Sequence, residues 1–385
     1  MHYFDYILEH YTWAGVALLV LLIAMFVVQL VYYIFTYRRI VKYRISKRKK
    51  RLTSAPPISV VIPLLSDDYE FLGSRLPRIL TQKYEAEYEV VVVFMGDNGD
   101  FYEELESMRL AYPTLRVTKL QYNPLLRITP KQVLNLGIKS ALHEHIIITT
   151  TTAAPASESW LSMMGKGFMR GEIVAGYTAI EQTSGVVNSL IRMSRMQTSI
   201  YHLSGAVKGE TYNVSRSNFG MTKSIYFAAN GFSHHNMNIG ENDLFIQKIA
   251  TRKNLCVVLT PKATVVEHQW GGLGWWLSQL KYFGSAYDQY PLNARNRIEW
   301  DLRSQTLFFM LALTAIVVMP LEIKLLAVVL LLIRLGVVLS VVRSIAQRLN
   351  ERKITMCYIL FDALNPLMML LLRIKFLRKD HSAWK

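Results

Sequence analysis

A long apolar run without a charged side chain lies near the start of the sequence, from Trp13 to about Phe35. Its 23 residues exceed the ~20 that a helix needs to cross the hydrocarbon core of a bilayer. The run is too long for the core of a signal peptide, and neither a charged leader nor a small-residue cleavage site accompanies it. We therefore expect a membrane-spanning helix here.

A dense basic segment follows this run directly. By the positive-inside rule, it places this end of the helix and the domain after it on the cytoplasmic side. We expect the segment also to touch anionic lipid headgroups, although a solvated linker would have the same composition. Its cations are Arg38, Arg39, Lys42, Arg44, Lys47, Arg48, Lys49, Lys50 and Arg51.

Three further apolar blocks lie in the last quarter of the chain. The first two run from near Leu307 to Val342 with a short break at Pro320, which predicts a helical hairpin that crosses the membrane twice. The last block, Ile354–Leu372, has basic residues on both sides, so a full crossing would violate the charge rule. An interfacial or re-entrant helix pair kinked at Pro366 fits this block better.

Composition agrees with a membrane protein. Lys and Arg exceed Asp and Glu by 44 to 28, but much of this excess flanks the apolar runs, so membrane topology explains it better than nucleic-acid binding. The only two cysteines are Cys256 and Cys357, which excludes a disulfide framework and agrees with a reducing cytoplasm. No Cys/His spacing indicates a structural zinc site.

Between about Ser54 and Arg297, predicted strands and helices alternate. This alternation favours an α/β domain with a mainly parallel sheet and ligands at the carboxyl ends of the strands. The β-branched runs predict strands at Ile58–Pro63, Tyr88–Phe94, Leu115–Leu120 and Ile146–Thr149. Helices are expected at Phe71–Gln82, around Tyr102–Ala111 and at Lys131–Leu142.

Five stretches in this region carry a family resemblance. They are ISVVIPLLSDD, ILTQKYEAEYEVVVV, KQVLNLGIKSA, SRSNFGMTKSIYFAANGF and IGENDLFIQKIA, in this order along the chain. Together they resemble a family-2 glycosyltransferase of the membrane-anchored bacterial type. The resemblance spans roughly Ile58 to Phe283.

The resemblance implies a Rossmann-like mixed sheet of the GT-A kind, inserted between transmembrane helices. We expect a first helix and basic linker over residues 1–53, a cytoplasmic glycosyltransferase-like domain over 54–300, and a hairpin with interfacial helices and a basic tail over 301–385. The implied location is the bacterial inner (cytoplasmic) membrane, crossed several times, with the main domain in the cytoplasm.

Inverting sugar transfer needs a cation for the departing diphosphate, a nucleotide site and a carboxylate base. After the second strand the family places Asp residues, and Phe94 and Met95 stand there; a short slip would let Asp97 serve instead. At the metal strand, Thr150 and Thr152 occupy the Asp-x-Asp positions. Hydroxyls do not replace two carboxylates as ligands of Mg²⁺ or Mn²⁺.

The other two motifs are altered as well. In the acidic motif, Asn242 occupies the position of the base, between Glu241 and Asp243, and Asn cannot accept a proton. The two acids would serve as a substitute base or, on the other interpretation, sit favourably at the start of a helix. In the later motif Gln279 remains, but Tyr282 replaces an arginine.

Four side chains would then be left for nucleotide binding: Asp97, Lys131, Gln279 and Lys281. Lys281 would equally snorkel at the membrane surface, because Trp275 and Trp276 give this segment the character of an interfacial helix.

Four losses of charge in one site favour a noncatalytic pseudo-glycosyltransferase, a partner or scaffold in bacterial envelope glycan or secretion machinery. Its expected partners are membrane lipid, a second envelope protein and a nucleotide-sugar or glycan, but no nucleic acid. No cofactor is expected, and Mg²⁺ or Mn²⁺ would bind only if the site were active despite its substitutions.

Two alternatives stay open. One is an active, metal-independent, inverting transferase that acts on an envelope glycan or lipid acceptor and uses Lys131, Arg127 or Lys281 in place of the cation. The other is a new metal site made by His234, His235 and Glu241. Adjacent histidines rarely face one ion, so a surface loop explains that pair better.

Overall fold

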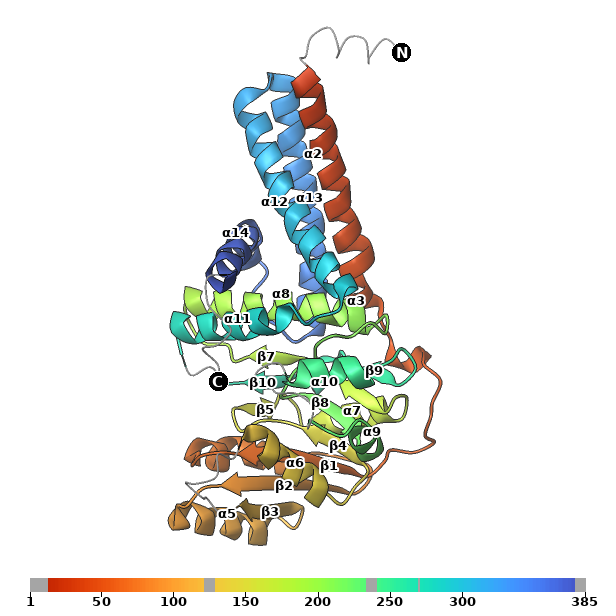
Figure 1. The fold of residues 1–385 in the computed structure, drawn as a ribbon, viewed down its shortest axis with the longest axis vertical. Coiled ribbons are helices and arrows are strands. Elements are labelled where there is room, and N and C mark those ends of the chain that lie inside the picture. The colour runs from red at the N-terminus through yellow and green to blue at the C-terminus, as the bar shows by residue number, and fades with distance from the viewer. Residues whose placement is uncertain (1–12, 121–128, 233–240, 269–270, 378–385) are drawn as a thin grey trace. The chain divides into compact units, whose positions relative to one another are not determined.

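The computed structural model describes residues 13–120, 129–232, 241–268 and 271–377, and it describes the backbone alone at 241–242, 281–286 and 368–377. The chain divides into two compact units (Figure 1). The helical unit comprises Met1–Lys42, Phe283–Ala346 and Arg352–Lys385. The sheet unit comprises Tyr43–Tyr282 and Gln347–Glu351.

Within the described residues, the sheet unit contains a seven-stranded sheet of order β3-β2-β1-β4-β8-β6-β9. The first four strands in this order are parallel, and β8 is antiparallel to both β4 and β6. The strands are β1 Ile58–Leu64, β2 Tyr88–Met95, β3 Leu115–Leu120, β4 His145–Ile148, β6 Ile173–Ala175, β8 Phe219–Thr222 and β9 Leu255–Val257. The predicted mixed α/β sheet is therefore confirmed.

A second, three-stranded sheet has the order β5-β10-β7 and lies beyond the end of β4 along the chain. Its strands are β5 Ala153–Pro155, β7 Thr178–Ile180 and β10 Val265–Glu267. In the central strand, Glu267 lies opposite Ala153 on the antiparallel side and opposite Ile180 on the parallel side. The strands that follow the threonine run therefore belong to a different sheet from the strand that precedes it.

The first strands form where β-branched residues run without interruption. In β1 and β2, Val60, Ile62, Val90 and Val92 are fully buried, as expected for strands covered on both faces. The adjoining helices complete the same core, in which Trp160 is the largest side chain. This rigid layer fixes the carboxyl ends of β1, β2 and β4 along one edge.

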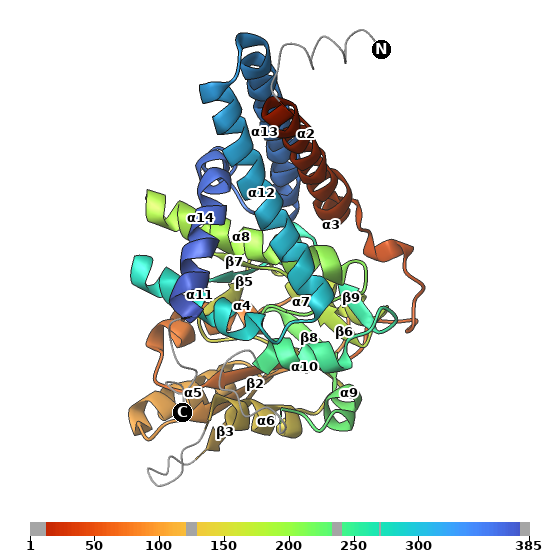
Figure 2. The same cartoon turned by 45° about the horizontal axis from the view of Figure 1, so that its top comes forward.

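Helices of the sheet unit connect and cover the strands (Figure 2). They are α4 Leu76–Leu80, α5 Gly99–Ala111, α6 Pro130–Ser140, α7 Trp160–Phe168, α8 Val186–Ala206, α9 Lys223–Ala228 and α10 Glu241–Ile249, with α11 Leu273–Tyr287 running on into the helical unit. Short 3₁₀ helices lie at η2 Ile45–Lys47 and η4 Pro261–Ala263, and a short π-helix, η3 Phe71–Arg75, leads directly into α4. The three helices predicted between the first strands are confirmed, with shifted ends.

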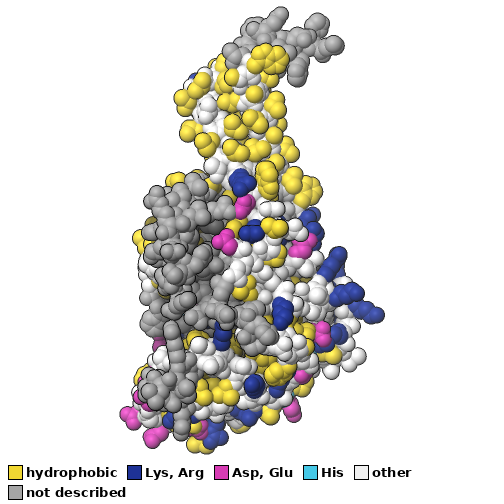
Figure 3. Space-filling model, in the orientation of Figure 1, with side chains coloured by type: hydrophobic (Ala, Val, Ile, Leu, Met, Phe, Trp, Pro, Cys, Tyr) yellow, Lys and Arg dark blue, Asp and Glu magenta, His cyan; other side chains and the backbone are white. Residues whose placement is uncertain are grey.

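The helical unit contains α2 Trp13–Val31, η1 Tyr32–Tyr37, α3 Arg38–Lys42, α12 Leu292–Val318, α13 Leu321–Arg348 and α14 Cys357–Leu377. Among the described residues, three segments are long and apolar enough to cross a membrane: Trp13–Lys42, Leu292–Val318 and Leu321–Arg348. We call them the candidate spans. Hydrophobic side chains cover the surface over α2, α12 and α13 (Figure 3).

The segment around Pro366 differs from the prediction. It forms one helix, α14, with Pro366 inside it, rather than a pair of helices. Proline cannot donate to the carbonyl four residues before it, here that of Asp362. The side chain of Gln305 donates to that carbonyl instead, at 2.8 Å. The donor to this carbonyl thus comes from another helix, α12, which the local sequence does not reveal.

Candidate functional site

The threonine run begins where β4 ends. β4 lies between β1 and β8, and the amide of Thr149 continues its ladder by donating to the Val61 carbonyl at 3.2 Å. The chain then turns through Thr150–Thr152 and enters β5. The expected position of the run, at the carboxyl end of a buried parallel strand, is confirmed.

Three hydroxyl groups meet at this turn, and we call them the hydroxyl corner: Thr150, Thr152 and Ser217. The Oγ1 atom of Thr150 lies 3.2 Å from that of Thr152 and 2.9 Å from Oγ of Ser217. Ser217 is buried just before β8. Neutral hydroxyls that hydrogen-bond one another therefore occupy the place that the resemblance assigned to two carboxylates.

An imidazole and a carboxylate lie beside the corner. The amide of His268, the residue after β10, donates to the Thr152 carbonyl at 2.7 Å. Nδ1 of His268 pairs with the carboxylate of Glu181, the residue after β7. The neighbouring Glu267 pairs with Arg195 at 3.1 Å. Each of these two carboxylates thus has a nitrogen partner.

Three residues near the corner were not predicted from the sequence: Ser217, Glu181 and His268. They come from segments far from the threonine run in sequence, and their strands are only three or four residues long. The sequence offers one signal for them, which is that each lies next to a short run of β-branched or aromatic residues. Pairing of β7 with β10, which brings Glu181 to His268, could not be read from such short strands.

A metal site would need more acidic or imidazole ligands than this. Within the part of the chain that the structure describes, no three His, Cys, Asp or Glu side chains come together as metal ligands. Mg²⁺ and Mn²⁺ prefer carboxylate and phosphate oxygens to hydroxyls. The alternative ligands His234 and His235, and the side chain of Glu241, lie outside the described residues.

The turn after β2 holds an aromatic residue where an acid was sought. Phe94 is fully buried in the core and packs against Phe101, with ring centroids 5.2 Å apart. Asp97 is exposed and precedes Asn98, which caps α5. The Asn98 amide donates to the carboxylate of Asp67 at 2.7 Å and so ties the loops after β1 and β2 together.

The acidic motif begins α10. This helix starts at Glu241, and the side chains of Glu241 and Asn242 lie outside the described part. Asp243 is buried and accepts a hydrogen bond from the Asn213 amide at 3.0 Å. This hydrogen bond holds the loop that carries Asn213 against α10.

The proposed nucleotide contacts lie on two helices. Lys131 is half-buried in the first turn of α6, whose start carries a capping box between Thr129 and Gln132. Gln279 is half-buried on α11, on which the indole nitrogen of Trp276 is buried with no hydrogen-bond partner among the described atoms. The side chains of Lys281 and Tyr282, and all of Arg127, lie outside the described residues.

Asn218, which lies in one of the five stretches that carry the family resemblance, has a structural role. Its side-chain amide is fully buried and donates to the carbonyls of Tyr177 and Ala263, both at 2.8 Å. Its side-chain oxygen accepts from the Trp160 indole at 3.0 Å. Asn218 thus joins strands of both sheets and sets the position of Ser217, its neighbour in the corner.

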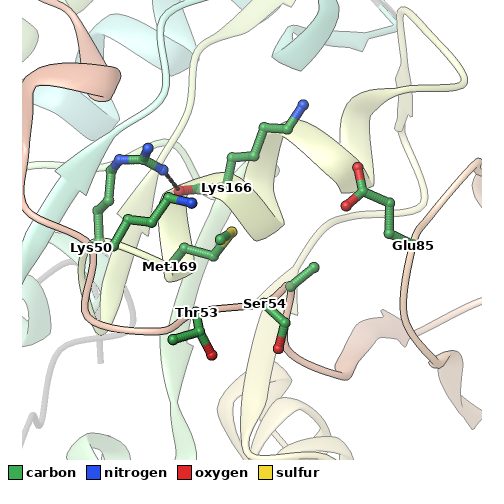
Figure 4. A pocket seen from close by; sticks show the side chains of 8 residues that line it. Lys50, Thr53, Ser54, Glu85, Lys166 and Met169 are labelled. Carbon is green, nitrogen blue, oxygen red and sulfur yellow. Dashed lines mark hydrogen bonds between the residues drawn. The ribbon is translucent and has the colours of Figure 1, made fainter.

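A separate basic pocket of about 450 Å³ lies at the end of α7 (Figure 4). Its lining residues are Lys50, Thr53, Ser54, Ala55, Glu85, Lys166, Met169 and Arg170. Arg170 donates to the Lys166 carbonyl at 3.2 Å. Cations at a helix carboxyl end are favoured by the helix dipole, which accounts for this cluster without a ligand.

Solved structures of similar fold are glycosyltransferases. A mannosyltransferase from Pyrobaculum calidifontis, solved with GDP-Man and Mn²⁺, matches with a TM-score of 0.53 and 14% identity over 87% of this chain and 99% of its own. Two structures of S. aureus TarS 1–349, one with UDP-GlcNAc, match at 15% identity. They have TM-scores of 0.42 and 0.41, cover 74% and 80% of this chain, and are themselves covered over 82% and 88%.

At such identities the likeness concerns the fold alone, and only the first of these matches has a TM-score above 0.5. No protein-family model and no curated protein matches the chain. The match to the mannosyltransferase structure shows that the chain has a glycosyltransferase-like fold.

Proposed function

We propose that this protein is a membrane-anchored pseudo-glycosyltransferase, a noncatalytic partner or scaffold in bacterial envelope glycan or secretion machinery. The hydroxyl corner carries the proposal. Thr150, Thr152 and Ser217 fill the end of β4 with neutral oxygens at mutual distances of 2.9 and 3.2 Å. Such a group supplies none of the negative charge that holds a divalent cation.

The charges around the corner also argue against a nucleotide diphosphate. Without a metal, a diphosphate needs cationic side chains to offset its charge. Next to the corner, Arg195 pairs with Glu267 and His268 with Glu181. The Glu267 carboxylate offsets the charge of Arg195, and the Glu181 carboxylate lies against the His268 ring, so these two pairs lower the positive potential available to an anion.

The anchoring part of the proposal rests on the candidate spans. With the basic segment after the first span, they favour a multi-pass protein of the bacterial cytoplasmic membrane whose sheet unit is cytoplasmic. A sheet unit held at the membrane with an unreactive site is suited to bind a glycan-handling or secretion protein.

Nucleotide binding by the purified full chain tests the proposal. UDP and GDP would be titrated with and without Mn²⁺ by isothermal calorimetry in detergent. We expect no Mn²⁺-dependent binding of either nucleotide. Tight, Mn²⁺-dependent binding would contradict the pseudoenzyme assignment.

A restored carboxylate pair tests whether the metal clamp alone has been lost. Thr150→Asp combined with Thr152→Asp should introduce Mn²⁺-dependent nucleotide binding if the rest of the site is intact. Thr150→Asn with Thr152→Asn is the matched control, because it has nearly the same shape without the charge. If both double variants bound nucleotide with the same dependence on Mn²⁺, the missing negative charge would not be the reason for the lost metal site.

The rival function is an active, metal-independent transferase, and it makes a different prediction. It requires nucleotide binding without metal that falls at least roughly tenfold in Lys131→Ala, since a charge-assisted phosphate contact would be lost. It also requires release of UDP or GDP from a nucleotide-sugar in native membranes. Copurification of a second envelope protein at fixed stoichiometry, without such release, supports the scaffold role.

A further inference from the structure

Polar side chains are buried inside the helical unit, among helices suited to a membrane. Groups of this kind are costly in hydrocarbon unless they pair, and they are retained for a reason. Six of them, each 3% exposed or less, come from four helices: Gln29, Asp301, Ser304, Gln305, Arg334 and Asp362. We call them the polar cluster.

The strongest contact in the polar cluster joins α13 to α14. Arg334 is 2% exposed and forms a two-pronged ion pair with the carboxylate of Asp362, through Nη1 to Oδ2 and through Nη2 to Oδ1. The guanidinium also faces the ring of Phe309, 4.8 Å from its centroid. A fork-to-carboxylate geometry fixes both partners in orientation as well as in distance.

Gln29 connects this ion pair to the other helices. Its side-chain oxygen accepts from Nη2 of Arg334 at 2.8 Å, and its amide donates to Ser304 at 2.8 Å. The amide also approaches Oδ1 of Asp301 at 3.3 Å, and Tyr37 donates to Oδ2 of Asp301 at 2.6 Å. The cluster therefore links α2, α12 and α13 before it reaches α14.

On α14, Asp362 offers two acceptors to the cluster because of Pro366. Its carbonyl is left without a helical donor by the proline, and Gln305 donates to that carbonyl at 2.8 Å and to the carboxylate at 2.7 Å. Because of the proline, the Asp362 carbonyl accepts a hydrogen bond from another helix, and the same residue carries the charged carboxylate. Gln305 of α12 donates to both groups, and Arg334 of α13 donates to the carboxylate alone.

The two faces of α14 have opposite roles. Tyr358, Phe361, Asp362 and Asn365 are buried, each 4% exposed or less. Over the part of α14 whose side chains are described, 357–367, the opposite strip exposes large apolar side chains: Ile359, Leu360, Leu364 and Leu367. Both views place α14 beside α12 (Figures 1 and 2).

We propose that the Arg334–Asp362 ion pair docks α14 on the candidate spans and turns its apolar strip toward lipid acyl chains. The described polar side chains of α14, Asp362 and Asn365, are buried inside the helical unit, and the strip has the same character as the exposed face of α12, with Met310, Leu313 and Val317. The hydrocarbon of the bilayer is the occupant that this continuity favours. The proposal does not depend on whether the sheet unit is catalytic.

Photocrosslinking of the full chain tests this docking. A benzophenone amino acid would replace Phe361 on the buried face or Leu360 on the exposed strip, in vesicles of phosphatidylethanolamine and phosphatidylglycerol. We expect position 361 to crosslink to α2, α12 or α13, and position 360 to crosslink to lipid. Lipid adducts from position 361, or protein adducts from position 360, would overturn the proposal.

Single changes of the ion pair test its role. Arg334→Met or Asp362→Leu leaves one charge buried and unpaired, so the intramolecular product at 361 should fall roughly tenfold or more. Leu332→Met, at an exposed position on the same helix, is the control and should change nothing. Unchanged crosslinking in both single variants would overturn the docking role.

Native thiols report whether the sheet unit stays folded in these variants. Cys256 is buried in the sheet unit, so it should not react with a thiol reagent while that unit is folded. If a single variant exposes Cys256, the charge-exchanged variant Arg334→Asp with Asp362→Arg decides the question. Recovery of the 361 crosslink supports the docking pair, and its absence overturns it.

Discussion

Three hydrogen bonds converge on the side chain of Asn218, a fully buried residue between the two sheets. Asn218→Ala would leave the Ala263 carbonyl and the Trp160 indole without partners, whereas the Tyr177 carbonyl would keep the Val265 amide. Each orphaned buried group costs about 1–3 kcal/mol, so we expect the variant to lose on the order of 3 kcal/mol or more of unfolding free energy. Thermal unfolding of the purified chain measures this.

The control for this prediction is Asn293→Ala, because Asn293 is exposed. Asn218→Asp should be at least as harmful as Asn218→Ala, since a carboxylate oxygen would then face two carbonyls. An Asn218→Ala variant as stable as the control would refute the structural role assigned to this residue.

Two buried histidines predict acid sensitivity. Burial, with Arg51 nearby, lowers the pKa of His145 to about 4, and burial, with Arg195 nearby, lowers the pKa of His202 to about 3. Both are neutral in the folded chain, whereas an unfolded histidine takes up a proton near pH 6.5. Stability is therefore present above pH ~6.5 and is lost as the pH falls toward these folded values.

Each histidine should contribute a loss of up to about 1.4 kcal/mol per pH unit in this window. Unfolding measured at pH 7.5 and pH 5 should show a smaller pH effect in a His145→Gln, His202→Gln double variant than in the wild type. The value at pH 7.5 gives the pH-independent cost of the two substitutions. Equal pH effects in both proteins would contradict the prediction.

At the scale of elements, the sequence predicted best where one pattern was long enough to read. The runs at Ile58–Pro63, Tyr88–Phe94 and Leu115–Leu120 are continuous, and β1, β2 and β3 follow them closely. The position of the antiparallel strand β8 and the whole second sheet were not predicted. Their strands have only three or four residues, too few to carry a period of their own.

The α13–α14 linker gives an element-scale prediction. Glu351, in this linker, is buried in the sheet unit, where it accepts from Tyr177 at 2.7 Å and pairs with Arg192 at 2.6 Å. Breaking a buried pair from one side costs about 3–5 kcal/mol, whereas replacing both charges by apolar groups is nearly neutral. We expect Glu351→Leu and Arg192→Met each to destabilise the chain by that order.

The double variant Arg192→Met with Glu351→Leu should recover most of this loss, although Tyr177 would keep an unpaired hydroxyl. Unfolding free energies of the four proteins form a double-mutant cycle. Additive effects, with no recovery in the double variant, would mean that the two residues act separately and that the linker is not held by their pairing.

At the scale of the whole molecule, the site depended on contacts that no local pattern reports. The sequence places Thr150 and Thr152 at the end of a buried strand, and the structure has them there. It does not show that Ser217 completes the corner or that His268 lies against Thr152, because the short strands that bring them there are long-range partners. The sequence shows that the expected charged residues are absent from the site. It does not show which residues from distant segments lie there instead.

Membrane topology is the remaining whole-molecule prediction. Each candidate span has 27 residues or more, and a helix of that length, at ~1.5 Å per residue, exceeds a hydrocarbon core of about 30 Å. The basic segment at the end of the first span predicts a cytoplasmic sheet unit, so the turn at Met319–Pro320 between α12 and α13 should face the opposite side.

Cysteine labelling of spheroplasts checks this arrangement in a Cys256→Ser, Cys357→Ser background. Glu322→Cys, exposed at the start of α13, should react with a membrane-impermeant maleimide in intact spheroplasts. Leu142→Cys, at a residue that is 68% exposed on the sheet unit, should react only after permeabilisation. The reverse pattern would invert the topology, and labelling of both before permeabilisation would rule out a cytoplasmic sheet unit. The result also decides on which side of the membrane a partner of the sheet unit would have to be sought.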